Sequence, residues 1–252
     1  MKKFITNKKV LYLLGIVLLL VLWQVIAWSV GQEELIFPGP YKTLLETINL
    51  LKSSYTFVCI LNSLKRMMIG FLISLLLAIV IGSFAGNSKI LSILLSPTIT
   101  SIKAIPTACL VFLFIILSGA KNAPIYIVTI VSFPILYEGV KGGINNIDKS
   151  IIEASELDGD NYFGIIRDIK LPLALPYIFV SIASSLSLSF KIEIMSEVIT
   201  GSTNTGLGSA IVTSQRLDPT NLVTIFAYGL LAIVISLILD SLLQVLKKKY
   251  DN

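Results

Sequence analysis

Long apolar runs alternate with short polar segments along this chain. An α-helix needs about 20 mostly apolar residues to cross a bilayer. Six runs meet or approach that length, and the pattern predicts six transmembrane helices at residues 10–28, 67–85, 90–117, 124–140, 172–199 and 222–246. The predicted fold class is therefore an all-α membrane protein.

The third run contains two internal prolines, Pro97 and Pro106. Proline removes a backbone hydrogen bond that lipid cannot replace. We therefore expect this span to be kinked and packed inside the bundle.

The first 61 residues form a unit distinct from the core at 62–246 and from the basic tail at 247–252. The first apolar run exceeds the ~7–15 residues of a signal-peptide core, and no small-residue cleavage site follows it. It predicts a retained span. After the turn-forming prolines Pro38 and Pro40, leucines and isoleucine recur at helical spacing between residues 44 and 51, which predicts a short amphipathic helix on the outer surface.

Composition supports a membrane location. Of the 252 residues, 55% are apolar and 14% are charged, whereas soluble domains carry about 25% charged residues. The mean hydropathy is +0.87. The basic residues stand in clusters at the ends of apolar runs, which argues against nucleic-acid binding despite the net charge of +5.

The distribution of Lys and Arg predicts the orientation. Six spans place both termini on one side, together with residues 141–170, and that side carries twelve basic residues against six on the other. The positive-inside rule then predicts cytoplasmic termini in a multi-pass protein of the cell membrane. Lys65 and Arg66 fit less well, because they flank the second run at its outer end.

The residue types argue against an enzyme and a metal centre. The chain has no histidine, and Cys59 and Cys109 lack the spacing of a metal pair. We interpret both cysteines as small buried apolar residues. No set of nucleophile and base is evident inside the spans.

The polar segment at 141–170 predicts a helix–glycine–helix element outside the membrane. Ser150 is expected to cap a helix, with Glu153 completing a capping box, and Gly159 to end it. A second short helix is expected from 162 to 169, before Pro172 opens the next span. Such an element would dock on a partner.

These residues also carry a family resemblance. Glu153-Ala154-Ser155, Gly159 and Ile169-Lys170-Leu171-Pro172 follow the spacing EAA-x3-G-x9-I-x-LP, with Ser155 in place of the second alanine. The segment resembles the EAA loop of ABC importer permeases. Ile105-Pro106, and Glu197 followed by Gly206-Leu207-Gly208, resemble the nitrate/sulfonate/taurine branch.

The resemblance implies a type I importer permease that works by alternating access. It assigns coupling to a separate cytoplasmic ATPase to Glu153, Ala154, Ser155, Gly159, Ile169, Leu171 and Pro172 of a loop at 141–171. It also implies a second permease copy in a homodimer and an extracytoplasmic solute-binding protein. This chain has no G-x4-G-K-[ST] loop, so ATP and Mg would be bound by the partner and no cofactor is expected here.

Charged and small polar residues in the fifth run leave two interpretations open. Lys191, Glu193 and Glu197, with Ser184 and Ser187, could line a solute pathway, because ionisable groups inside a membrane normally face protein or water. Alternatively, the charges lie near the headgroups or pair within the bundle, and the serines allow close helix packing.

A secondary transporter and a channel are the alternative functions. The first predicts repeated halves, which are not evident, and the second gives no reason for the loop motif. The solute stays open among a small oxyanion, a sulfonate and a vitamin-like heterocycle. Residues 201–220, rich in Gly, Ser and Thr, are expected to form a loop.

Overall fold

The computed structural model describes residues 8–30, 37–148, 150–152, 162–201 and 205–250, and no β-strand occurs among them. The all-α prediction is confirmed. The elements are α2 (Lys8–Val30), α3 (Pro40–Leu51), α4 (Ser54–Asn87), α5 (Lys89–Ala104), α6 (Thr107–Asn145), α8 (Tyr162–Gly164), the π-helical stretch η1 (Ile165–Lys170), α9 (Leu171–Thr200), α10 (Leu207–Leu217) and α11 (Leu222–Tyr250).

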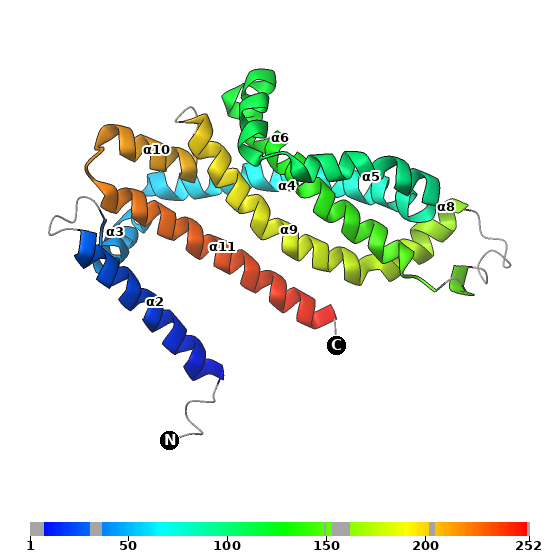
Figure 1. The fold of residues 1–252 in the computed structure, drawn as a ribbon, viewed down its shortest axis with the longest axis horizontal. Helices are drawn as coiled ribbons and strands as arrows, with labels where there is room; N and C mark the ends of the chain where they lie inside the picture. The colour runs from blue at the N-terminus through cyan, green and yellow to red at the C-terminus, as the bar shows by residue number, and fades with distance from the viewer. Residues whose placement is uncertain (1–7, 31–36, 149, 153–161, 202–204, 251–252) are drawn as a thin grey trace.

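The long helices lie along the long axis of an elongated bundle (Figure 1). Helices α3 and α10 lie at one end of α9 and α11, and α8 lies at the other end of α9. The main interfaces join α4 to α6 and α6 to α9. Met67 of α4, Tyr137 of α6 and Phe190 of α9 are among the largest buried side chains of the core. Helix α2 meets the segment before α3, where the Trp23 indole N–H donates to the carbonyl of Pro38, and most of its apolar residues are exposed.

Small residues bring the three core helices close together. A Cβ atom at Gly82 of α4 would lie 2.9 Å from Cβ of Val140 in α6. One at Gly139 of α6 would lie 2.2 Å from Cβ of Ser181 in α9. Because lipid gives no hydrophobic drive for association, such close backbone approach is a main source of attraction between membrane helices.

Among the described residues, five helical segments are long and apolar enough to cross a membrane, one fewer than the six that were predicted. The predicted continuous span at 90–117 is wrong, because α5 ends at Ala104 and α6 begins at Thr107. The break falls at Ile105–Pro106, so the expected interruption is confirmed there, while Pro97 lies inside α5. Helix α6 then continues through a kink at Gly119, whose φ of 76° is left-handed and favours glycine.

The second predicted span begins thirteen residues too late. Helix α4 starts at Ser54, so Lys65 and Arg66 lie within it rather than at its outer end. The first, fifth and sixth spans match α2, α9 and α11 closely. The fourth corresponds to the part of α6 that follows Gly119 and extends to Asn145.

The amphipathic helix is present as α3. Its buried residues are Thr43 and Thr47, whereas Leu44, Ile48 and Leu51 are exposed. The apolar side is therefore free of protein within the described chain, as an outer-surface helix requires. Cys59 is buried as predicted, but Cys109 is exposed, so that interpretation was wrong for the second thiol.

Candidate functional site

An ion-pair network joins α4, α9 and the segment before α10. Arg66 Nε lies 3.0 Å from Glu193 Oε1, and a second guanidinium nitrogen contacts Glu197 Oε1. Glu193 is 0% exposed and Glu197 is 1% exposed. Acidic side chains are almost never fully buried unless paired. One guanidinium thus serves two buried carboxylates from successive turns of α9.

Glu197 also accepts hydrogen bonds from neutral groups. Ser63 Oγ donates to Glu197 at 2.8 Å, and the backbone N–H of Gly208 donates to Glu197 Oε2 at 2.7 Å. The Leu207 N–H in turn donates to Ser63 Oγ at 2.8 Å. These bonds satisfy the first N–H groups of α10 and fix that helix against α4 and α9.

The glycines of the Gly206-Leu207-Gly208 motif permit this close approach. A Cβ atom at Gly208 would lie 2.5 Å from the carbonyl oxygen of Ile194. One at Gly206 would lie 2.3 Å from both Arg66 and Glu197. The sequence singled out Glu197 and this motif together, and the structure brings them into contact. It did not predict α10, which replaces most of the expected loop at 201–220.

Sequence reasoning missed Arg66 as the partner of the two glutamates. Its position at the outer end of the predicted span, against the positive-inside rule, could have indicated the pairing. A cation that is paired within the bundle does not follow that rule. Because Glu193 and Glu197 are buried by this pairing, the structure favours pairing within the bundle over an exposed position in a pathway for these two residues.

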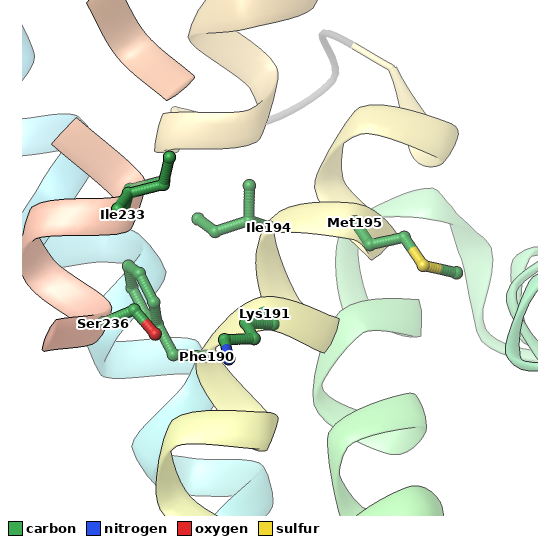
Figure 2. A pocket seen from close by; sticks show the side chains of 7 residues that line it. Phe190, Lys191, Ile194, Met195, Ile233 and Ser236 are labelled. Atoms are coloured by element: carbon green, nitrogen blue, oxygen red, sulfur yellow. The ribbon is translucent and has the colours of Figure 1, made fainter. Parts of the chain in front are cut away.

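The other three candidate pathway residues lie elsewhere on α9. Ser187 is buried and its hydroxyl lies 3.2 Å from Ser236 Oγ of α11, while Ser184 is exposed and donates to the carbonyl of Val180. Lys191 is exposed and lines a cavity of about 370 Å³ between α9 and α11 (Figure 2). Lys191 and Ser187 therefore both lie at the α9–α11 boundary, away from the ion-pair network.

A second cavity, of about 190 Å³, lies between α4 and α6. It is more polar than the first. Its lining consists of Asn62, Lys65, Arg66, Ile69, Lys121, Asn122 and Ile125. The positive charge of Arg66 is already balanced by the two glutamates of α9.

The final segment of the expected coupling loop, residues 162–170, is continuous with α9. The stretch η1 runs into Leu171 without a break, and the N–H of Leu171 donates to the carbonyl of Ile166, five residues earlier. Pro172 has no N–H, so the regular pattern is disturbed at this point and a wider turn accommodates it. The predicted separate helix at 162–169 is therefore the beginning of the spanning segment.

The same stretch is tied to the end of α4. Lys170 Nζ bonds to Asn87 Oδ1, and the rings of Phe163 and Phe84 meet edge to face with centroids 6.4 Å apart. Ile166 is buried beside them. Of the seven predicted coupling residues, Ile169, Leu171 and Pro172 lie in this region, and Glu153, Ala154, Ser155 and Gly159 lie outside the described residues.

Asp148 caps the helical turn that begins the loop. Its Oδ1 accepts from the Ser150 N–H at 3.0 Å, and this bond holds the pKa of the Asp148 carboxyl below its ordinary value. The N-cap role was expected of Ser150, so that assignment was wrong. An aspartate serves the same purpose, because its carboxylate accepts from the free N–H groups of the first turn.

Comparison with known proteins identifies the family. Residues 78–252 match the family model of the binding-protein-dependent transport system inner membrane component. A Bacillus subtilis protein described as an aliphatic sulfonates transport permease, SsuC, is 26% identical over 92% of this chain and 83% of its own length. The Synechococcus elongatus nitrate import permease NrtB is 25% identical over 75% of this chain and 71% of its own length.

Solved structures of ABC transporters share the fold. An amino acid ABC transporter chain aligns with a TM-score of 0.62 and 18% identity, covering 76% of this chain and 92% of that one. A chain of the MetNI methionine ABC transporter aligns with a TM-score of 0.60 and 19% identity, covering 79% and 97%. The family match covers well over half of the sequence. This chain is therefore a member of the binding-protein-dependent transport system inner membrane component family, a permease subunit of ABC importers and not an enzyme.

Proposed function

We propose that this chain forms the translocation pathway of an ATP-driven importer of a small solute and couples to a separate ATPase through residues 141–171. The observation that supports this proposal is the continuity of η1 with α9, together with the bond from Lys170 to Asn87. A displacement of residues 165–170 would move α9 and α4 together, because η1 runs into α9 without a break and Lys170 bonds to α4.

The other end of α9 is also joined to α4. Glu193 and Glu197 bind Arg66 of α4, so the two helices are joined near both ends. From Leu171 to Glu193 the rise is about 33 Å at 1.5 Å per residue. Two helices joined in this way move as one rigid unit, which is what a rocking mechanism of alternating access requires.

The partners follow from the same proposal. Two copies of this chain form the pathway, each seated on one ATPase subunit that binds ATP and Mg, and an extracytoplasmic binding protein delivers the solute. The loop at 141–171 and the end of α11 lie in the cytoplasm. Lys247, Lys248 and Lys249 at the end of α11 and the basic residues of the loop support this orientation. The solute belongs to the anion or vitamin-precursor classes.

The experiment compares two variants at the described end of the loop. The complex with its ATPase is reconstituted in proteoliposomes, and ATP hydrolysis and solute uptake are measured together. Removing the link in Asn87→Ala or Lys170→Met is expected to leave ATP hydrolysis intact and to reduce uptake several-fold. Lys89→Met, two residues beyond Asn87, is the control and should behave as wild type. Equal uptake by all three variants would contradict transmission through this contact.

A further inference from the structure

Lys191 occupies an unusual position for a cation. It lies nine residues before the end of α9, about 14 Å along the helix from Thr200. Leu188, Met195 and Val198 on the same exposed side are apolar. A lysine at this depth is unfavourable in hydrocarbon, and such residues normally face a cavity or a partner.

The Lys191 ammonium has no carboxylate within ion-pair distance among the described residues. Glu193 and Glu197 are engaged by Arg66. At 100° per residue, Lys191 and Glu193 point in nearly opposite directions from α9. The positive charge of Lys191 is therefore not neutralised within the described part of the protomer.

The space beside Lys191 matches a small organic molecule. The cavity of about 370 Å³ lies within the range typical of ligand sites. Figure 2 shows side chains from α9 and α11 around it, with Lys191 as its charged residue and Ser236 as its hydroxyl. The remaining lining is apolar: Phe190, Ile194, Met195, Ala232 and Ile233.

We propose that Lys191 and this cavity form a binding subsite for a small organic anion with an apolar body, of the alkanesulfonate type. The ammonium binds the anionic head by a charge-assisted hydrogen bond, which is about twice as strong as a neutral one. The aliphatic body contacts Phe190, Met195 and Ile233. The subsite rests on the proposed function, since it names the chemical class of the solute.

The mostly apolar lining of the cavity favours an organic anion over a small inorganic oxyanion. An inorganic oxyanion is hydrated on all sides and needs several polar partners, whereas this cavity offers one ammonium and one hydroxyl. Ser236 Oγ is also within 3.2 Å of Ser187, so it is only partly available. The more polar cavity between α4 and α6, which contains Lys65, is the rival anion site.

The test is equilibrium dialysis of radiolabelled butanesulfonate against the full-length chain with its ATPase in nanodiscs, without ATP. Lys191→Met is expected to weaken binding by at least about tenfold, and Lys191→Arg to stay within about threefold of wild type. Lys65→Met removes a cation from the rival cavity and is expected to bind as wild type does. Unlabelled butanesulfonamide, a neutral analogue, is expected to compete poorly with wild type.

Three results would overturn the subsite: equal binding by wild type and Lys191→Met, loss of binding in Lys65→Met instead, or equal competition by butanesulfonamide. The last result needs no variant, so it holds even if Lys191→Met does not fold. ATP-dependent uptake by the wild-type complex is measured separately. Uptake that persists without selective binding at Lys191 refutes the subsite alone, whereas selective binding without ATP-dependent uptake refutes the proposed function.

Discussion

Replacing Arg66 tests the interpretation of the ion-pair network most directly. Arg66→Met keeps an unbranched apolar stem and removes the guanidinium group with its charge. It leaves two buried carboxylates, Glu193 and Glu197, without a cation among the described residues. The variant retains an apolar stem, so the expected change comes mainly from the lost charge and hydrogen bonds of the guanidinium.

The magnitude follows from the burial of both acids. Removing one partner of a buried ion pair costs about 3–5 kcal/mol, because the remaining charge is neither solvated nor paired. Here one cation serves two carboxylates, so the upper part of that range is expected. Folded domains are stable by about 5–15 kcal/mol, and a loss of this size is therefore a large fraction of the total.

The assay is thermal unfolding of the detergent-purified chain, followed by circular dichroism. For chains of this size about 1 kcal/mol corresponds to about 2–4 °C, so the midpoint is expected to fall by roughly 6 °C or more. The double variant Arg66→Met/Glu193→Gln removes one of the two unpaired buried carboxylates and should recover part of the lost thermal stability.

Lys65→Met is the matched control. Lys65 is the neighbour of Arg66 in α4 and is exposed. The same substitution there removes a charge and leaves no buried carboxylate without a cation. A midpoint within about 1 °C of wild type is expected for it, since substitutions at exposed positions usually change stability little. If Arg66→Met behaved like this control, or if the double variant were no more stable than the single one, the network would not stabilise the bundle electrostatically.

Two further predictions concern packing and capping. Gly139→Leu should destabilise the chain by about 1–3 kcal/mol, because a Cβ atom there would lie 2.2 Å from Ser181. Gly142→Leu is the control, because a Cβ atom at Gly142 would have no neighbour within 4 Å. Equal unfolding midpoints for the two variants would refute the argument. The pKa of Asp148 is lowered by its bond to Ser150, so the cap contributes stability above the carboxyl's ordinary value of 3.8 and loses it as the pH falls through the lowered pKa. Hydrogen exchange should show protection of the Ser150 amide that declines in that acid range and is absent throughout in Asp148→Ala; protection that ignores pH would count against the cap.

The fold class could be predicted because membrane helices obey a strong and simple constraint. Every backbone polar group in lipid must be satisfied internally, so long apolar runs become helices whatever their neighbours are. That is why α2, α9 and α11 match their predicted bounds closely. Pro106 likewise ends α5, because a missing N–H is a local property of the residue.

The errors arose where a distant contact decides the local structure. Helix α4 was expected to begin after Lys65 and Arg66, because charges normally end a span. Arg66 continues it, since its charge is balanced by two acids more than 120 residues away in the sequence. Helix α10 was missed for a related reason. Its first N–H groups are bound by Glu197 and by Ser63, which is distant in the sequence, whereas its glycines taken alone are typical of a loop.

The central claim is that this permease imports its solute only when a separate ATPase drives it. The most direct measurement is uptake by proteoliposomes that contain the chain with its ATPase and binding protein, with ATP present or absent, for wild type and Gly159→Asp in the predicted coupling loop. We predict ATP-dependent uptake in wild type and its loss in the variant, with the variant still inserted and folded. Uptake that continues without ATP or without the ATPase would contradict the claim and favour a secondary transporter or a channel.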